Sequence, residues 1–305
     1  MDDYGKGLAL ALAAAVISGF SVFINGVAVK LADPFVYTTL KNIGALVFLA
    51  AIVLALNGLA HFRSLSKKQW GLLVLIGLIG GSVPFLMFFW GLKLGGAAVS
   101  SFIFRSLFLF AGVFGYLLLK ERPEPRDIAA GFIILAGNAL LLSGDLVFGL
   151  GQVLVLGATA LWALEYTISR KIMADVHPRV VMVSRMFFGS VVLLGFLAAT
   201  GSLGISLASA EALQWLAITS VLLFAFLLAW YAALKHLPVL KATAVLALGG
   251  VITAALDLFF LGKAVTLTEA SGLLLILAGA LAMVGLADTL RAAGRMKEII
   301  PGLVE

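Results

Sequence analysis

Cysteine is absent from the 305 residues of this chain, and charged residues are scarce. Without cysteine there can be no disulfide framework and no thiolate chemistry, and the redox compartment cannot be inferred from cysteine usage. Asp, Glu, Lys and Arg make up only 12% of the residues, against about 25% in an ordinary soluble domain. Hydrophobic residues make up 63%, and the mean hydropathy is +1.16. These values exclude a soluble domain and indicate an integral membrane protein.

Sequence patterns for nucleotide-driven and metal-dependent chemistry are also missing. There is no G-x-x-x-x-G-K-[ST] loop that would hold nucleotide phosphates. His61, His177 and His236 are far apart and have no metal-binding spacing. The two carboxylates expected at membrane depth, Glu165 and Asp257, are predicted to lie toward opposite faces, which makes them a poor catalytic dyad. We therefore expect no enzyme activity, no cofactor and no metal site.

The apolar residues occur in runs of about 20, the length that a helix needs to cross ~30 Å of hydrocarbon. The first run follows Asp2 and Asp3 and is longer than the apolar core of a signal peptide, so we interpret it as a membrane helix. The sequence predicts ten membrane helices, at about residues 7–29, 34–58, 70–92, 96–119, 126–144, 149–169, 178–200, 212–234, 238–261 and 267–288.

The net charge of +6 is explained by membrane topology and needs no nucleic-acid partner, because the basic residues form short clusters between apolar runs. If the N-terminus is cytoplasmic, fifteen Lys and Arg residues fall in or beside inner segments, and only Lys30, Lys93 and Lys263 fall in outer loops. Lys and Arg concentrate in cytoplasmic loops. We therefore predict a multi-pass protein of the cell (inner or plasma) membrane with both termini in the cytoplasm.

The two halves of the chain share a sequence pattern. A basic residue follows seven positions after a helix-opening proline in each half, at Lys41 after Pro34 and at Arg185 after Pro178. A shift of 142 also places residues 134–137, "ILAG", on residues 276–279. Because each half has five helices, an odd number, the second half must be inverted in the membrane. The predicted fold is thus all-α, with five-helix repeats at 1–145 and 146–290 and a cytoplasmic tail at 291–305.

A family resemblance follows from these segments. "LLLKERPEPRDIAAGFIILAGNALL", residues 117–141, resembles the junction of helices four and five in the EamA-type branch of the drug/metabolite transporter superfamily. "AAAVISGFSVFINGVAVKLADPFVYTTLK" and "LWALEYTISRKIMADVHPRVVMVSR" resemble the first two helices of each repeat. The resemblance covers about residues 8–288. It implies a ten-helix transporter that works by alternating access and moves small organic solutes, often outward.

The chain departs from this family pattern at two charged positions. Lys263 stands where the second repeat would carry the counterpart of Glu121. Arg105 stands where members of the family often have a proline near the middle of helix four. The substrate of a generic relative therefore cannot be transferred to this chain.

Five charged residues are predicted to lie within the membrane helices, where a charge costs several kcal/mol and usually faces a cavity or another charge. Their depths allow two ion pairs, Lys41 with Asp257 and Glu165 with Arg185, which could be structural or could couple transport to protons. Arg105 is left over, ~13 Å below the outer surface at a rise of about 1.5 Å per residue. Its guanidinium suits a carboxylate or phosphate, so we predict that Arg105 binds the anionic group of a substrate.

Other polar and aromatic residues within helices are candidates for the same site. Trp162, Tyr166, Glu165 and Asn138 could line it, although packing between helices is the alternative for each. Pro84, which follows two glycines in helix three, could kink that helix or act as a hinge.

The expected function is that of a secondary transporter, with an amino acid or related carboxylate-bearing metabolite as the solute and export as the direction. The alternatives are a multidrug or cation efflux carrier of the same superfamily, a channel, and a membrane-embedded enzyme. The expected partners are the substrate and membrane lipid, with no nucleic acid, and coupling to protons is open against facilitated diffusion or exchange. Monomer and homodimer are both open.

Overall fold

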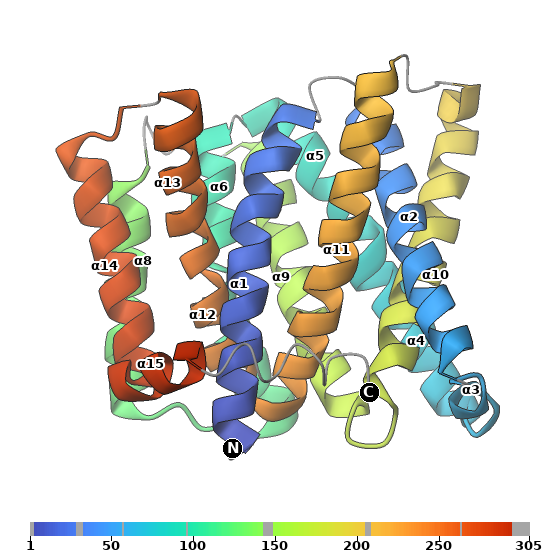
Figure 1. Ribbon diagram of the computed structural model, residues 1–305, viewed down its shortest axis with the longest axis horizontal. Helices are drawn as coiled ribbons and strands as arrows, with labels where there is room; N and C mark the ends of the chain where they lie inside the picture. The colour runs from blue at the N-terminus through green and yellow to red at the C-terminus, as the bar shows by residue number, and fades with distance from the viewer. Residues whose placement is uncertain are drawn as a thin grey trace.

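The computed structural model describes residues 3–28, 33–56, 58–95, 97–142, 149–204, 209–262 and 264–294. Lys263 and the predicted tail beyond residue 294 lie outside these residues. The described chain is helical and contains no strand, and nine of its helical spans are long and apolar enough to cross a membrane. The tenth predicted span is α8 (Pro125–Leu140), which has 16 residues and packs along α14 (Leu267–Val284) within the same bundle (Figure 1). The predicted all-α fold is confirmed.

The first repeat contains five spans, of which the third and fourth are interrupted. Its elements are α1 (Asp3–Ala28), α2 (Pro34–Ala55), the short α3 (Ala60–Arg63), α4 (Lys67–Gly81) with α5 (Val83–Gly95), α6 (Ala97–Arg105) with α7 (Leu107–Phe114) and the π-helical turn η2 (Gly115–Leu119), and α8. The second repeat is interrupted only in its fourth span. Its elements are α9 (Leu150–Ile172), α10 (Pro178–Ala199), the 3-10 turn η3 (Ser202–Gly204), α11 (Ala210–His236), α12 (Val239–Leu246) with α13 (Leu248–Leu261), α14, and the short α15 (Leu286–Gly294).

The helix ends repeat in register. The α1–α2 hairpin corresponds to the α9–α10 hairpin at a difference of 144 in residue number, shown by the pairs Pro34 and Pro178, and Ala55 and Ala199. The fourth and fifth spans correspond at a difference of 142, shown by the pairs Leu119 and Leu261, and Pro125 and Leu267. The internal repeat predicted from the sequence is therefore a repeat of the helices themselves.

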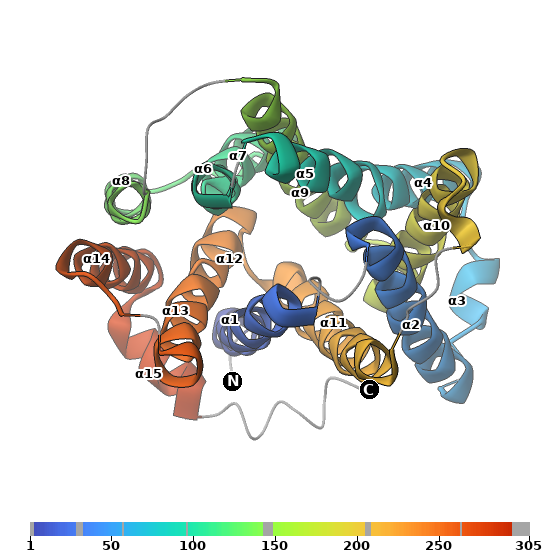
Figure 2. The same cartoon turned by 90° about the horizontal axis from the view of Figure 1, so that it is seen from above.

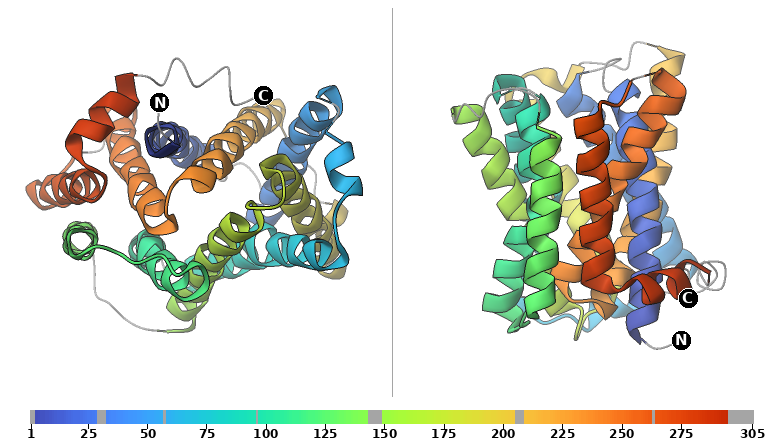
Figure 3. Two further views of the ribbon diagram at one scale, coloured as in Figure 1. Left: turned by 90° about the horizontal axis from the view of Figure 1, so that it is seen from below. Right: turned by 90° about the vertical axis from the view of Figure 1, so that its left-hand side faces the viewer.

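The two repeats run in opposite directions through the bundle. Gly7, near the start of α1, lies against His236 and Leu237, and Arg170, near the end of α9, donates a hydrogen bond to the carbonyl of Leu237. The start of α1 and the end of α9 therefore lie at the same end of the molecule, where α15 also lies (Figures 1 and 3). We call this the inner end, because the sequence predicts it to be cytoplasmic.

The corresponding second helices of the two repeats begin in the same way. Asp33 caps α2 by accepting hydrogen bonds from the backbone N–H groups of Phe35 and Val36, at 2.9 and 3.0 Å. His177 caps α10, where its Nδ1 accepts from the backbone N–H of Arg179 at 3.2 Å. Burial, and then the nearby cations, lower the pKa of His177 to about 4. The imidazole is thus neutral at pH 7, which leaves Nδ1 free to accept.

The core and the outer surface are both apolar, as expected of a protein in lipid. Trp230 and Tyr231 of α11 have no exposed surface. On the outside, Phe259 and Leu267 are 80% and 86% exposed. Seen from above, α1, α9, α11 and α12 surround the middle of the bundle, whereas α8 and α14 lie at its edge (Figure 2). The polar groups near the middle are therefore the candidates for a functional site.

Two glycines allow α4 and α10 to cross in close contact. A Cβ on Gly189 would lie 2.6 Å from the carbonyl oxygen of Gly81, and a Cβ on Gly81 would lie 2.4 Å from the carbonyl oxygen of Arg185. Real Cβ atoms do not approach backbone atoms so closely, so the crossing needs glycine at both positions. Because this crossing joins the two repeats, the glycines contribute directly to the arrangement of the site.

We expect Gly189→Ala to lower the stability of the protein by about 1–3 kcal/mol, because the new methyl group must push α4 away from α10. Gly195→Ala is the matched control: Gly195 lies on the same helix with nothing within 4 Å of a built Cβ, so the change should be neutral or raise stability by up to about 1 kcal/mol. Thermal unfolding of the two variants in detergent measures the difference. Equal melting temperatures would contradict the close contact.

Candidate functional site

Pro84 interrupts the third membrane span. Its ring nitrogen carries no hydrogen, so the carbonyl of Gly80 lacks the donor that a helix would place four residues later. The N–H of Phe85 donates to the carbonyl of Ser82 at 2.9 Å. In a regular helix it would donate to the carbonyl of Gly81, which is therefore released as well. The helix ends at Gly81 and restarts at Val83, with Ser82 between them. The predicted kink at Pro84 is present as this interruption, and its use as a hinge stays a prediction.

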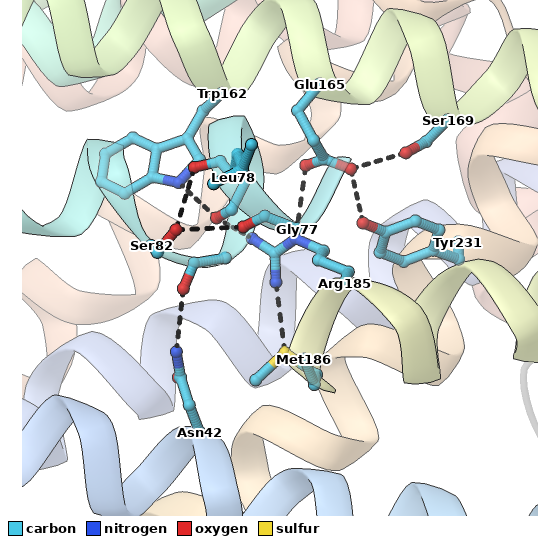
Figure 4. Close-up of polar contacts among 12 residues, drawn as sticks. Asn42, Gly77, Leu78, Ser82, Trp162, Glu165, Ser169, Arg185, Met186 and Tyr231 are labelled. Carbon is cyan, nitrogen blue, oxygen red and sulfur yellow. Dashed lines mark hydrogen bonds and ion pairs between the residues drawn. The ribbon is translucent and has the colours of Figure 1, made fainter. Parts of the chain in front are cut away.

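Side chains from three other helices take up the released carbonyls (Figure 4). The carbonyl of Gly80 accepts from Trp162 Nε1 at 3.1 Å and from Arg185 Nη2 at 2.8 Å. The carbonyl of Gly81 accepts from Asn42 Nδ2 at 3.3 Å. An unpaired buried carbonyl in a membrane protein costs several kcal/mol, so these contacts fix the interrupted span to α9, α10 and α2.

Glu165 and Arg185 form a buried ion pair next to this interruption. Arg185 Nε lies 3.4 Å from Glu165 Oε2, and the two side chains are 5% and 0% exposed. Glu165 Oε1 accepts from Ser169 Oγ and from the Tyr231 hydroxyl, both at 2.6 Å (Figure 4). The structure therefore brings together the inner pair predicted from depth. It also shows that the carboxylate is already occupied by protein groups.

Lys41 does not meet Asp257. Its Nζ lies 3.4 Å from Asn25 Oδ1 on α1, whereas α13, which carries Asp257, packs on α1 through Thr253, whose hydroxyl donates to the carbonyl of Gly19 at 2.9 Å. This finding replaces the predicted pairing of Lys41 with Asp257. Depth along the membrane was a poor guide here, because it says nothing about which helices are neighbours.

Arg105 lies where two interrupted helices meet. It is the last residue of α6, and Ser106 separates α6 from α7. Its guanidinium is next to Gly250, in the first turn of α13, where a built Cβ would be 3.5 Å from Arg105 Nε. The interruption at Ala247 between α12 and α13 corresponds in the second repeat to the one beside Arg105. Within the described part of the chain, Arg105 has neither a carboxylate nor a hydrogen-bonding partner.

The two predicted aromatic residues are buried. Trp162 is 6% exposed, and its ring packs against Phe85, Phe88 and Phe104 at centroid distances of 5.2, 5.6 and 5.3 Å. Phe104 precedes Arg105, so Trp162 links the interrupted third span to the helix that carries Arg105. Tyr166 is 7% exposed and packs on Trp230 at 4.9 Å. Both rings therefore belong to the buried packing around the site.

Asn138 lies apart from these groups. It is 1% exposed on α8, at the edge of the bundle, and its side-chain amide has no hydrogen-bonding partner among the described residues (Figure 2). The sequence placed Asn138 in one candidate site with Trp162 and Glu165. The structure does not bring it together with them.

The inner end contains ion pairs that were not predicted from the sequence, in which Arg170 and Lys241 are two of the fifteen basic residues of the inner segments. Arg170 Nε lies 2.6 Å from Glu121 Oε1, and Glu121 Oε2 accepts from the backbone N–H of Val239 at 2.9 Å. Lys241 Nζ lies 3.6 Å from Asp127 Oδ1. Each pair joins one repeat to the other. The available signal was the presence of two carboxylates among the basic residues at the start of α8, Glu121 in the preceding loop and Asp127 in the first turn.

Comparison with known proteins agrees with this architecture. The model of the EamA-like transporter family matches residues 5–143 and 149–285. No curated protein sequence matches the chain. A solved structure described as "Crystal structure of protein" has a TM-score of 0.75 and 21% identity, and the match covers 93% of this chain and 98% of that chain. At this identity the likeness shows a shared fold and nothing more.

We expect Glu165→Ala and Arg185→Ala each to cost about 3–5 kcal/mol of stability, because each leaves a buried charge without its partner. The double variant should lose clearly less than the two single losses together, because it removes both charges. Melting temperatures in detergent give the three values, with Lys68→Met at an exposed position as a control. Additive losses would mean that the two side chains do not interact.

Proposed function

We propose that this chain carries solutes that bear a carboxylate. The chain belongs to the EamA-like transporter family. It is therefore a small-molecule transporter of the drug/metabolite transporter superfamily and not an enzyme. The observation that carries this proposal is Arg105, a guanidinium inside a membrane span with no partner in the described chain. A charge in that position is costly unless something neutralises it. A carboxylate of the transported solute would do so.

The surroundings of Arg105 suit an anion. α7 begins directly after Ser106, and α13 begins at Leu248 beside the guanidinium. The N-terminus of a half-helix carries free N–H groups and a partial positive charge, which transporters with interrupted helices direct at anionic groups of the substrate. Arg105 adds a planar fork that can bind a carboxylate through two parallel hydrogen bonds.

Among carboxylates, an amino acid or a related metabolite remains our first choice, with export as the direction. The pairing of Glu165 with Arg185 means that this carboxylate is not free to attract a cationic drug. Arg105 would repel such a drug. A multidrug or cation carrier is therefore the less favoured alternative.

Alternating access would use the interruptions and the inner-end ion pairs. Glu121 with Arg170 and Asp127 with Lys241 join the repeats at the inner end, so a state open at that end requires these pairs to separate. The interruptions at Ser82, Ser106 and Ala247 are the points where the spans can bend without breaking further helical hydrogen bonds. The inverted repeat then supplies two related arrangements of the same helices.

We expect Arg105→Ala to weaken carboxylate binding by about 30-fold or more, because a charged hydrogen-bonding partner is worth about 2–5 kcal/mol in a dry site. Arg105→Lys should be intermediate, since lysine keeps the charge but loses the planar fork. Counterflow of a labelled amino acid into proteoliposomes measures the affinity and also separates a carrier from a channel. The exposed Lys93→Met serves as control, and unchanged affinity in both Arg105 variants would refute the assignment.

We expect transport without obligatory proton coupling, because Glu165 is held by Arg185, Ser169 and Tyr231. Uptake rates into proteoliposomes should be the same with and without an imposed pH gradient at equal internal solute. Accumulation driven by the gradient would instead favour a proton antiporter. In that case we expect Asp257→Asn to abolish the accumulation and Glu165→Gln to leave it intact, and the comparison of the two variants would identify the carboxylate that carries the proton.

A further inference from the structure

The repeat relates Lys41 to Arg185 and also relates their surroundings. At the difference of 144 that aligns the α1–α2 hairpin with the α9–α10 hairpin, Lys41 corresponds to Arg185, Ser21 to Glu165 and Asn25 to Ser169. Each hairpin therefore has a cation on its second helix, facing two positions one turn apart on its first helix.

Polar contacts connect the three positions in each repeat, Arg185, Glu165 and Ser169 in the second cluster and Lys41, Asn25 and Ser21 in the first. In the second repeat Arg185 Nε lies 3.4 Å from Glu165 Oε2, and Ser169 Oγ donates to Glu165 Oε1 at 2.6 Å. In the first repeat Lys41 Nζ lies 3.4 Å from Asn25 Oδ1, and Asn25 Nδ2 lies 3.0 Å from Ser21 Oγ. Both clusters use the same three positions, but the cation contacts Glu165 in the second cluster and Asn25, the counterpart of Ser169, in the first. The position of Glu165 is taken in the first cluster by Ser21, a hydroxyl in place of a carboxylate.

This difference leaves the first cluster one negative charge short. The amide of Asn25 is neutral, and among the described residues its long contact satisfies only one of the three N–H groups of the ammonium. Serine is also shorter than glutamate by two carbons and lacks the carboxylate, so the place that Glu165 fills in the second cluster is not filled by Ser21. The second cluster shows which chemistry suits such a place: an oxygen anion beside the cation.

We propose that Lys41, Asn25 and Ser21 form a binding site for a carboxylate group supplied from outside the chain, in the position that corresponds to the Glu165 carboxylate. Lys41 provides the charge, Asn25 and Ser21 provide polar contacts, and the ligand completes the cluster that the protein completes by itself in the second repeat. The site lies on α1 and α2, distinct from Arg105 on α6.

The carboxylate has two possible sources. It can be the second carboxylate of a solute whose first carboxylate binds Arg105, a reading that rests on the proposed function and makes dicarboxylates the preferred substrates. It can also be a separate monocarboxylate ion. The shared requirement is a carboxylate at Lys41, and binding stoichiometry distinguishes the sources.

The sharpest test restores the missing charge within the chain. Ser21→Glu gives the first cluster the carboxylate of the second, so it should compete with the ligand and weaken its binding by about tenfold or more, as Lys41→Met should. Ser21→Ala removes the hydroxyl without adding charge and should have a much smaller effect. Lys41→Arg, which copies the cation of the second cluster, should keep binding. The melting temperature of each variant establishes that it is folded.

Binding of succinate, glutarate and butyrate to the purified full chain, measured by titration calorimetry at neutral pH, separates the outcomes. If one solute bridges both cations, Ser21→Glu and Lys41→Met weaken the dicarboxylates and leave butyrate unchanged. If the ion is separate, each variant binds one butyrate fewer per chain than the wild type. Unchanged affinity and stoichiometry for all three ligands in folded Lys41→Met would overturn the proposal.

Arg105→Ala keeps this test independent of the proposed function. If Arg105 binds no carboxylate, that variant binds all three ligands as the wild type does, yet Ser21→Glu still abolishes binding at Lys41. If Arg105 is the anion site and Lys41 is not, Arg105→Ala weakens the binding of all three ligands and Ser21→Glu leaves their binding unchanged.

Discussion

The missing N–H of Pro84 is the constraint on which the centre of this molecule depends. It leaves the carbonyl of Gly80 without a helical donor at membrane depth, where water cannot replace it. Arg185 and Trp162 supply the donors from two different helices. Arg185 in turn needs a counter-charge, which Glu165 provides, and Glu165 is held by Tyr231 on a fourth helix. One absent hydrogen atom thus accounts for a connected set of polar contacts that would otherwise be hard to justify in lipid.

The repeat makes the differences between the halves informative. Related hairpins place a cation at the same position, but the second half neutralises Arg185 with Glu165 while the first half has Ser21 at the corresponding site. The third span is interrupted in the first half and continuous in the second, because α11 has no proline within it. One cluster therefore has its counter-charge within the chain. The other cluster and the surroundings of Arg105 each lack a negative charge among the described residues, and both cations belong to the first repeat.

Much of the fold could be predicted because hydrophobic length and basic-residue bias act along the chain. The predicted spans agree with the helices to within a few residues, and the interruption near Pro84 has a direct sequence signal. The interruptions at Ser106 and Ala247 have no such signal, since neither is followed by a proline in the next turn. They depend on how the fourth spans pack against their neighbours, and this is why Arg105 could be placed at a depth but not at a junction of two helices.

Composition and local order were enough to predict the membrane environment, the helical spans, the duplication and the charges within the spans that need a partner. The partners of these charges follow only from the packing of the helices. It paired Glu165 with Arg185, turned Lys41 toward Asn25 and joined Glu121 to Arg170 across the repeats. The physical reason is that ion pairs and hydrogen bonds require contact within a few ångströms, and helices far apart in sequence become neighbours only when the bundle is packed.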